Sequence, residues 1–372
     1  MFKKLVFSTL LFVIVATATN AQKTIALTDP VALYNRGLAL FDKEKYGSAI
    51  AEFEEFITKT DDAELRTNAQ YYIAVSGLQL EHQGAEERME AFIEANEGHI
   101  KTNLAYFQLA RYYYNTEKYN KVPGLTVILI GDLTPSQIYV RNKEKSANEV
   151  GLKSEVIKYP DSVEEKVILE KINELNNDKS VSGILVQLPL PKHIDKKKVI
   201  EAIDHTKDVD GFHPINVGNL SSGYESSVPC TPLGCYLLIK KFEPNLNGKK
   251  AVVIGRSNLN GKPMTQLLLK ENCTVTITHS KTKDLKAECL EADIVVAAVG
   301  IPELVKGDWV KKDAIVIDVG INKTEKGIVG DVAFDEVSKN AKALTPVPGG
   351  VGPMTIACLL KNTIDCFKRS QI

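Results

Sequence analysis

Short apolar runs separated by mixed, mostly polar stretches dominate the chain from residue 125 onward. Each run is four to six residues long, which is the length of a buried β-strand. The stretches between them have the length and periodicity of helices. This alternation predicts an α/β fold with a mostly parallel sheet. The runs are Leu125–Ile130, Gly183–Val186, Ala251–Ile254, Thr274–Thr278, Ile294–Val299 and Ile315–Val319.

Residues 31–121 show a helical and weakly repetitive pattern instead. The stretch 45–49 (Lys-Tyr-Gly-Ser-Ala), followed by Phe53, has the Tyr, Ala, Phe spacing of a helix-turn-helix repeat. Lys118-Tyr119 repeats its opening 73 positions after Tyr46 (119 − 46), which is close to twice the tetratricopeptide period of about 34 residues. Tyr71-Tyr72 and Tyr106-Phe107 fall where the first helix of a repeat should pack. The segment resembles tetratricopeptide repeats, which offer a concave surface to a protein partner, but a helical bundle without a partner fits equally well.

The repeat array stops within a unit. Residues 117–121 should open the second helix of a repeat, yet Val122-Pro123-Gly124 follows at once and breaks it. An array that ends this way leaves an apolar face uncovered, which is unfavourable for a natural terminus. We therefore infer a fusion or an assembly join near residue 121.

The N-terminus has the layout of a secretory signal peptide. Lys3 and Lys4 precede the apolar run Leu5–Ala16, and small residues lead to Gln22, so residues 1–21 predict export. The run is too short to span a bilayer comfortably, and no later segment has a transmembrane pattern. A formal net charge of −1 favours neither a nucleic-acid partner nor an anionic membrane.

The six cysteines all follow residue 229, and no two have CxxC spacing. A zinc or redox motif is therefore not predicted. Most of these cysteines are typical of small buried hydrophobes in a reducing compartment.

A phenol and an amine share one helix face after the first strand. The turn 131–135 separates that strand from the stretch Ser136–Lys145, which is predicted to be helical. Tyr139 and Lys143 are four residues apart, so their side chains lie on the same face. They form a candidate acid/base pair, although a solvated first helical turn is the more ordinary interpretation of this stretch alone.

A glycine turn after the strand Ala251–Ile254 predicts a phosphate site. Gly255-Arg256-Ser257 and Gly261 lie between this strand and the next helix, where backbone amides and the helix dipole face an anion. The spacing is not G-x-G-x-x-G, so the signal for a Rossmann fold is incomplete. The following strand ends in the stretch 278–281 (Thr-His-Ser-Lys), where an NAD enzyme would carry a carboxylate. NADP is favoured, because Arg256 can pair with its 2′-phosphate.

Three further loops are candidates for ligand contact. Gln187 follows the strand Gly183–Val186 and is itself followed by a Leu-Pro-Leu-Pro stretch, at the edge where parallel sheets bind ligands. The loop 207–212 carries Asp208 and Asp210, which are too few carboxylates to predict a metal site. The stretch 346–355 brackets glycines between prolines, which suggests a backbone that approaches a flat ligand.

Taken in order, these motifs closely resemble the bifunctional methylenetetrahydrofolate dehydrogenase/methenyltetrahydrofolate cyclohydrolase family, over about residues 121–369. The resemblance implies two α/β lobes, with residues 122–228 and the helix 353–369 forming the folate domain and residues 229–352 a Rossmann-type NADP domain. It also implies NADP-dependent oxidation of 5,10-methylenetetrahydrofolate, hydrolysis of the product to 10-formyltetrahydrofolate, a homodimer and a cytoplasmic location. This location conflicts with the predicted export.

The family's functional residues are carried over position by position. Lys143 matches the catalytic lysine, Gln187 its hydrogen-bond partner, and Tyr139 a residue packed near the pterin. Asp210 matches the carboxylate that holds the amino edge of the pterin. The implied cofactor contacts are Gly255, Arg256, Ser257, Ser280 and Ile321, and the implied folate contacts also include Val186, Leu188, Pro348, Gly349, Gly350, Val351 and Gly352. No metal is implied.

The implied chemistry agrees with these residue types. The methenyl compound is a cation that water must attack while protons move, which requires an amine that is partly neutral near pH 7. The family's usual helical segment before Pro123 is replaced here by the repeat-like sequence. An exported repeat scaffold that carries an inactive enzyme remnant, and a two-lobed NADP dehydrogenase of the shikimate type, are the alternatives; the second leaves Tyr139 and Lys143 unexplained.

Overall fold

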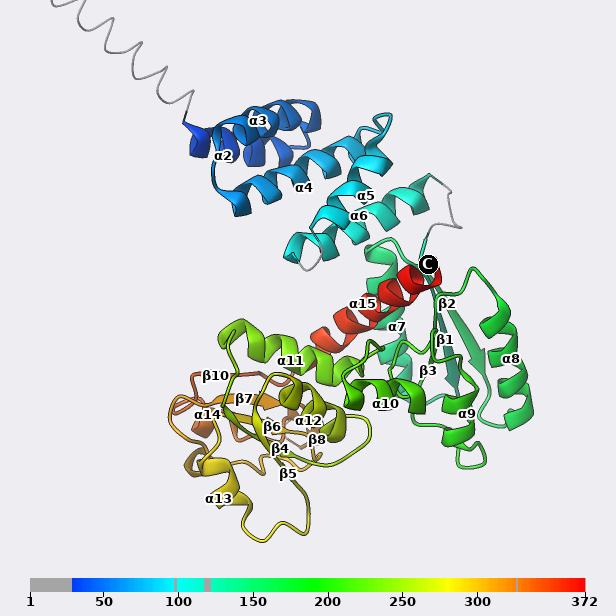
Figure 1. Ribbon diagram of the computed structural model, residues 1–372. Coiled ribbons are helices and arrows are strands. Elements are labelled where there is room, and N and C mark those ends of the chain that lie inside the picture. The colour runs from blue at the N-terminus through cyan, green and yellow to red at the C-terminus, as the bar shows by residue number, and fades with distance from the viewer. Residues whose placement is uncertain (1–28, 97–98, 117–121, 326, 372) are drawn as a thin grey trace, which may run out of the picture. The chain divides into compact units, whose positions relative to one another are not determined.

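The computed structural model describes residues 29–96, 99–116, 122–325 and 327–371, and these form two compact units divided after Lys121 (Figure 1). The predicted signal peptide, residues 1–21, and the predicted repeat opening at Lys118-Tyr119 lie outside the described residues. Export and the third repeat therefore stay predictions.

The first unit contains helices joined by short turns. They are α2 (Pro30–Phe41), α3 (Tyr46–Lys59), α4 (Ala63–Gln79), α5 (Ala85–Ala95) and α6 (Ile100–Asn115). Asp29 caps α2 by accepting from the Val31 N–H, and Asp62 caps α4 by accepting from the Leu65 N–H, which satisfies backbone donors at each helix start. Helices that are adjacent in sequence pack on one another, as in helical hairpins.

Aromatic side chains form the core of this unit. Phe53 and Phe56 are fully buried, and the Phe53 ring stacks on Tyr72 of α4 at a centroid distance of 5.4 Å. Tyr34 of α2 meets Phe53 edge-on at 5.7 Å. Gly37 lies directly beneath the Phe53 ring, where a Cβ atom would collide. The residues singled out for repeat spacing thus pack helix against helix, while their assignment as tetratricopeptide repeats stays a prediction.

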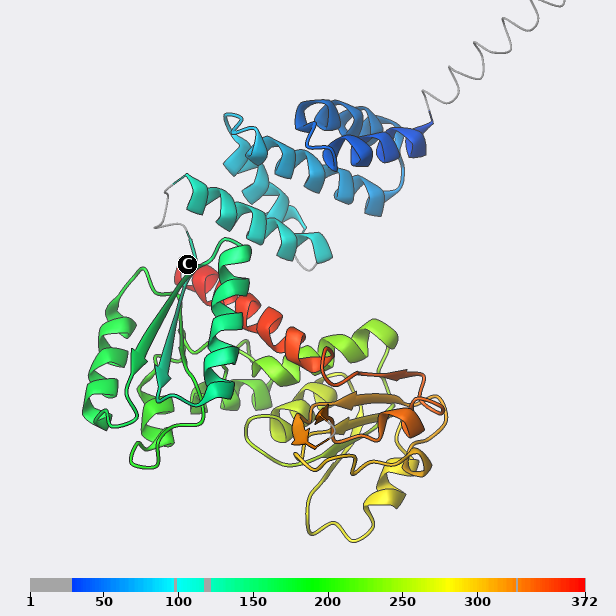
Figure 2. The same cartoon turned by 180° about the vertical axis from the view of Figure 1, so that it is seen from behind.

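The second unit begins with a three-stranded parallel sheet, in the order β2-β1-β3. Its strands are β1 (Gly124–Ile130), β2 (Lys153–Tyr159) and β3 (Gly183–Val186), linked by α7 (Thr134–Glu149) and α8 (Glu165–Asn177). α8 and α9 (Lys196–Ala202) cover one face of the sheet, with Ile168 and Val199 packed against Ile184. α7 lies over the other face, beside the last helix of the chain (Figure 2).

A second, five-stranded parallel sheet follows, in the order β10-β7-β6-β4-β5. One face packs on α10 (Pro214–Ser222), α11 (Cys230–Phe242) and α12 (Gly261–Lys270). The other packs on α13 (Leu285–Leu290), the 3-10 helix η2 (Gly307–Trp309) and α14 (Phe334–Val337). The strands are β4 (Lys250–Ile254), β5 (Thr274–Thr278), β6 (Ile294–Ala297), β7 (Ile315–Asp318) and β10 (Ala343–Leu344); β8 (Asn322–Thr324) and β9 (Gly327–Val329) form an antiparallel hairpin.

The C-terminal helix α15 (Val351–Gln371) belongs to both lobes of this unit. Val351, at its start, is part of the core beneath the five-stranded sheet. Further along, α15 contacts β1, β3 and α7 of the first lobe. α11 packs closely on it, because Gly234 leaves no Cβ to meet Met354. The last residues of the chain therefore complete the lobe that the first strand begins.

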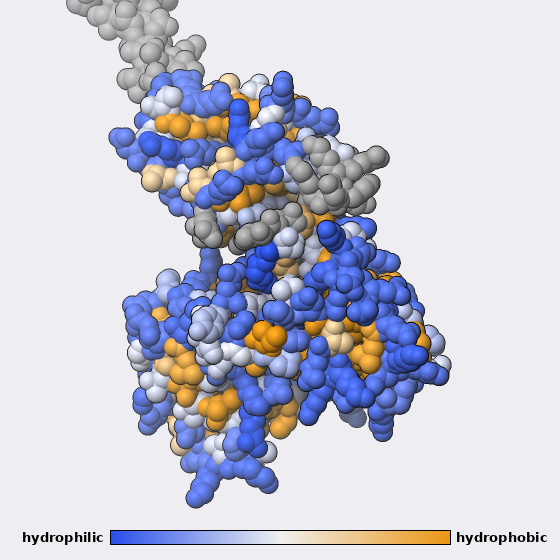
Figure 3. Space-filling view, turned by 45° about the vertical axis from the view of Figure 1, so that its right-hand side comes forward, coloured by the Kyte–Doolittle hydropathy of each residue, from blue (hydrophilic) through white to orange (hydrophobic). Residues whose placement is uncertain are grey.

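The character of the surface and of the longer helices bears on membrane association. On the face shown in Figure 3, hydrophobic residues form separate patches on a mostly hydrophilic surface. Among the residues that the structure describes, no helix combines the length and the apolar character needed to cross a bilayer.

Candidate active site

An amine lies on the buried face of α7. The buried residues of this helix, Ser136, Val140, Lys143 and Ala147, recur at the spacing of one helix face, and Lys143 is only 7% exposed. Tyr139, one turn earlier, is half-buried. A lysine among apolar core positions is rarely found without a specific partner.

That partner is Gln187, directly after β3. The Lys143 Nζ donates to Gln187 Oε1 at 3.0 Å. The amide is fixed in turn, because its Nε2 donates to the Leu188 carbonyl at 2.8 Å and its backbone N–H donates to Ile128 O at 2.9 Å. The hydrogen bond that the family resemblance implies is therefore present, between elements 44 residues apart in the chain.

Asp210 lies in a loop that runs beside β3. The Ile184 N–H donates to Lys207 O at 2.8 Å, and Ile184 and Asp208 form a parallel bridge, so the loop extends the sheet by one position. Asp210 is half-buried, and burial raises the pKa of its carboxyl to about 6. The nearby Lys143 charge limits this rise, whereas Asp208 adds to it.

Asp208 holds this loop in place. It is 2% exposed, and its carboxylate accepts from Gly211 N at 3.0 Å, His213 N at 2.8 Å and Asn216 Nδ2 at 2.9 Å. Burial raises the pKa of Asp208, and these hydrogen bonds oppose the rise. Sequence reasoning placed Asp208 in the motif but gave it no role; the structure assigns it the fixing of the turn that carries Asp210.

Two side chains that were not singled out for this site fasten the same loop. Asn362 of α15 donates to both the Val209 and Val228 carbonyls at 2.8 Å. The Cys230 thiol donates to Val209 O at 3.3 Å and lies 4.0 Å from Asp210 Oδ1. Burial raises the pKa of the Cys230 thiol well above its usual range, so it remains a protonated donor. The role of Asn362 could not be recognised from the sequence, because its hydrogen-bond partners lie more than 130 residues earlier in the chain.

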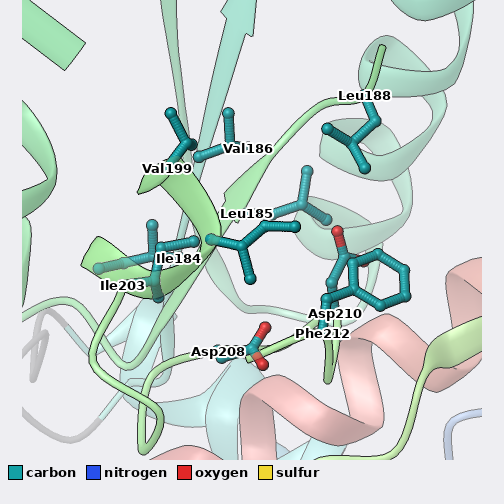
Figure 4. A pocket seen from close by; sticks show the side chains of 10 residues that line it. Ile184, Leu185, Val186, Leu188, Val199, Ile203, Asp208, Asp210 and Phe212 are labelled. Carbon is teal, nitrogen blue, oxygen red and sulfur yellow. The ribbon is translucent and has the colours of Figure 1, made fainter. Parts of the chain in front are cut away.

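A small pocket opens beside these groups (Figure 4). The strand end Ile184–Val186, Leu188 and Phe212 line it together with Asp208 and Asp210, and α9 closes its apolar side. Val186 and Leu188, two expected folate contacts, thus line the same pocket as Asp210. The remaining expected folate contacts lie in the loop after β10 and at the start of α15: Pro348, Gly349, Gly350, Val351 and Gly352. Pro348 and Gly349 are exposed, whereas Val351 is buried in the core.

The expected cofactor residues lie in the second lobe, at the carboxyl edge of the five-stranded sheet. Gly255, Arg256 and Ser257 follow β4, Ser280 follows β5, and Ile321 follows β7. Gly255 has φ +112° and faces the Ala298 carbonyl after β6, so a side chain there would collide. Ser257 Oγ accepts from Asn260 N at 3.1 Å, which closes the turn before α12. Arg256, Ser280 and Ile321 are exposed.

This arrangement can position a ligand and move protons. On the first lobe, one amine is hydrogen-bonded to a neutral amide and is close enough to a carboxylate to influence its charge. On the second lobe, a glycine turn precedes a helix. Within the described ranges, no group of three or more His, Cys, Asp or Glu side chains is placed to hold a metal ion.

Comparison with known families matches both lobes. The family model described as tetrahydrofolate dehydrogenase/cyclohydrolase, catalytic domain, matches residues 94–210, and that described as the NAD(P)-binding domain of the same family matches residues 229–371. The first match begins before residue 121, where the resemblance was expected to start.

Individual relatives agree. A bifunctional protein FolD from Pelagibacter ubique is 86% identical over 254 residues, which cover 68% of this chain and 90% of that protein. The crystal structure of the bifunctional enzyme FolD-methylenetetrahydrofolate dehydrogenase/cyclohydrolase from Campylobacter jejuni is 48% identical, with a TM-score of 0.68 and coverage of 72% of this chain and 96% of that one. A Trypanosoma brucei enzyme of this kind, complexed with NADP cofactor and inhibitor, is 38% identical, with a TM-score of 0.67 and coverage of 72% and 95%.

Proposed function

The chain belongs to the tetrahydrofolate dehydrogenase/cyclohydrolase family, and we propose that the residues around Lys143 serve both reactions of that family at one site. It is a bifunctional enzyme that oxidises 5,10-methylenetetrahydrofolate with NADP and hydrolyses the methenyl product to 10-formyltetrahydrofolate. The α/β fold and the NADP domain predicted from the sequence are confirmed.

The observation that supports the residue roles is the hydrogen bond from Lys143 to Gln187. Hydrolysis begins when water attacks a cationic carbon, and the water must lose a proton as it does so. An amine held by a neutral amide can accept that proton, because the amide fixes its position without adding a negative charge that would favour the ammonium form. We assign Lys143 the role of proton acceptor and donor and Gln187 the role of orienting it. Tyr139, half-buried one turn earlier, is the candidate for packing beside the pterin.

Asp210 is assigned to the pterin. A pterin presents N–H donors along its amino edge, and a carboxylate can accept two parallel hydrogen bonds from such donors. With a pKa of about 6, the Asp210 carboxyl is mostly ionised at neutral pH. Asp208, Cys230 and Asn362 hold its loop against β3, so the carboxylate is in position before a ligand arrives.

The second lobe has the features that NADP requires. The backbone around Gly255 offers amides at a helix N-terminus to a pyrophosphate, and the close approach of Ala298 leaves room only for glycine. No carboxylate follows β5 to repel a 2′-phosphate, and the exposed Arg256 can pair with one. NADP⁺ supplies the hydride acceptor when bound; the chain's own contribution is to hold both ligands at a fixed separation and orientation.

The alternative of an inactive enzyme remnant is not favoured, because Lys143, Gln187 and Asp210 are assembled with their supporting hydrogen bonds. We also propose a homodimer, and a protein partner for the first unit. Recombinant protein incubated with methylenetetrahydrofolate and NADP⁺ should produce NADPH and then 10-formyltetrahydrofolate. Folded protein that produces neither would contradict the function.

A further inference from the structure

Two buried carboxylates in the second lobe bind backbone rather than any partner cation. Asp331 is 0% exposed and Asp318 is 3% exposed. Asp318 Oδ1 accepts from Gly320 N at 3.1 Å and Asp331 N at 2.8 Å, and its Oδ2 accepts from Val332 N at 3.0 Å. Asp318 therefore fixes the segment from which the Asp331 side chain projects.

Asp331 passes this constraint on to the loop after β6. Its Oδ2 accepts from Val299 N at 2.7 Å and Gly300 N at 3.0 Å, and its Oδ1 accepts from Ile301 N at 2.9 Å. The Oδ1 atom also accepts from Asn322 Nδ2 at 2.9 Å, on the chain that leaves β7. One carboxylate thus binds three consecutive amides of one loop and a side chain of the next.

Two glycines make this approach possible. A Cβ atom at Gly320 would collide with the Asp331 carboxylate, and one at Gly330 would collide with the Asp318 carboxylate. The backbone of the β7 loop and the chain after β9 can therefore reach the two carboxylates closely. Four hydrogen bonds to Asp331 compensate its desolvation without an ion pair.

The two loops that Asp331 joins lie at the ligand edge of the sheet. β6 and β7 are neighbours on the side of β4 opposite β5. The adenosine ribose of a dinucleotide lies at the strand that corresponds to β5, so the nicotinamide half extends towards β6 and β7. Ile301 and Ile321, one on each loop, are 50% and 57% exposed there. Exposed apolar side chains at a binding edge offer a contact face for a planar ring.

We propose that Asp331 is a positioning residue for the NADP site, which acts by fixing the backbone of residues 299–301 and joining it to the β7 loop. Asp318 supports it by holding the 331–332 backbone. Neither carboxylate touches the cofactor in this assignment. The inference rests on the dehydrogenase function proposed above, and it extends that function to a residue outside the glycine turn after β4.

The test is Asp331→Asn, with Asp335→Asn as the matched control. The asparagine keeps the shape but turns one acceptor oxygen into a donor that faces backbone N–H groups. Because each buried amide left unpaired is costly, the Kd for NADP⁺ measured by calorimetric titration should rise by about tenfold or more. Asp335 is exposed on α14, four residues away, so D335N should bind as wild type does.

Two further measurements separate positioning from general stability. The cyclohydrolase step, assayed on methenyltetrahydrofolate without NADP⁺, should keep its wild-type rate in D331N. Deuterium exchange should accelerate in the peptide containing residues 298–302 and not in the peptides of the first lobe. An unchanged Kd for NADP⁺ would overturn the inference, and so would a parallel loss of cyclohydrolase activity.

A milder substitution decides the case in which D331N does not fold. Asn322→Ala removes one side-chain hydrogen bond to Asp331 and leaves its three amide bonds in place. A weaker rise in the Kd for NADP⁺ with normal hydrolysis supports the inference; wild-type affinity contradicts it. The wild-type isotherm tests the proposed function separately, because a wild-type chain that does not bind NADP⁺ would contradict that function whatever the variants do.

Discussion

Replacing Lys143 with methionine removes the amine while keeping most of the volume of the side chain. The position is 7% exposed and lies on the buried face of α7, so an apolar replacement is compatible with its surroundings. The substitution deletes the hydrogen bond to Gln187 Oε1. Leaving the amide oxygen of Gln187 unpaired costs about 1–3 kcal/mol of stability. Part of this cost is offset, because the variant no longer has to bury a polar amine, so it should fold.

The two reactions should respond differently. A positioned acid/base group contributes roughly 10²- to 10⁴-fold to a proton-transfer step, so we expect hydrolysis of methenyltetrahydrofolate to fall by that factor. Hydride transfer needs no protein acid, and the dehydrogenase should lose about tenfold or less through poorer positioning of the folate. In wild type, the Lys143 charge lowers the pKa of the Asp210 carboxyl; in the variant, which lacks this charge, that pKa should rise further above about 6.

The assay follows NADPH formation and the disappearance of the methenyl compound on the same preparation of protein. Lys145→Met is the control, because Lys145 is 74% exposed and its ion pair with Glu149, at 3.7 Å, is of the weak i,i+4 surface kind. Equal loss of both activities in K143M would refute the proton-transfer role. Equal damage in K145M would show that the effect comes from α7 as a whole.

Three further predictions follow from the site. The pKa of Asp210 in the folded state, about 6, exceeds its ordinary value of 3.8, so the folded state binds more protons than the unfolded state between these pH values. The free energy of unfolding of wild type relative to Asp210→Asn should therefore increase by about 1–2 kcal/mol from pH 7 to pH 4.5, as measured by denaturant titration. A difference that does not change with pH would contradict this prediction. For Arg256→Gln, the KM for NADP⁺ should rise about 10- to 100-fold, with little change in the KM for NAD⁺. The control Lys270→Gln, at an exposed position, should leave both KM values unchanged. An equal rise in the KM values for NADP⁺ and NAD⁺ would argue against a contact with the 2′-phosphate. Asp208→Asn should cost about 1–3 kcal/mol of stability and raise the KM for folate, because an amide NH2 replaces one of the two carboxylate oxygens and a single acceptor oxygen is left for three donors. An unchanged KM would exclude this positioning role.

The sequence predicts buried strands far better than exposed ones. All six apolar runs form strands of the two sheets, although β6 ends at Ala297 and β7 at Asp318, slightly before the runs do. β2 was missed because Lys153–Tyr159 alternates exposed and half-buried positions at a sheet edge and contains no apolar run.

The candidate site shows the same limit. Lys143, Gln187 and Asp210 stand out in motifs, and the structure places Lys143 in hydrogen-bond contact with Gln187 and near Asp210. The groups that hold them do not stand out, because their role depends on which backbone lies opposite. Asn362 is one polar residue in a helix, and Asp331 belongs to an ordinary Gly-Asp turn in the sequence. Only the folded chain shows that these side chains accept or donate several hydrogen bonds each.

The return of α15 to the first lobe has a consequence for synthesis. The loop of Asp210 is translated about 150 residues before Asn362, the side chain that satisfies the Val209 and Val228 carbonyls. Until α15 has left the ribosome, the pterin side of the enzyme lacks this support. The support of the Asp210 loop therefore forms only after the segment around Asn362 has been made, about 150 residues later than the loop itself.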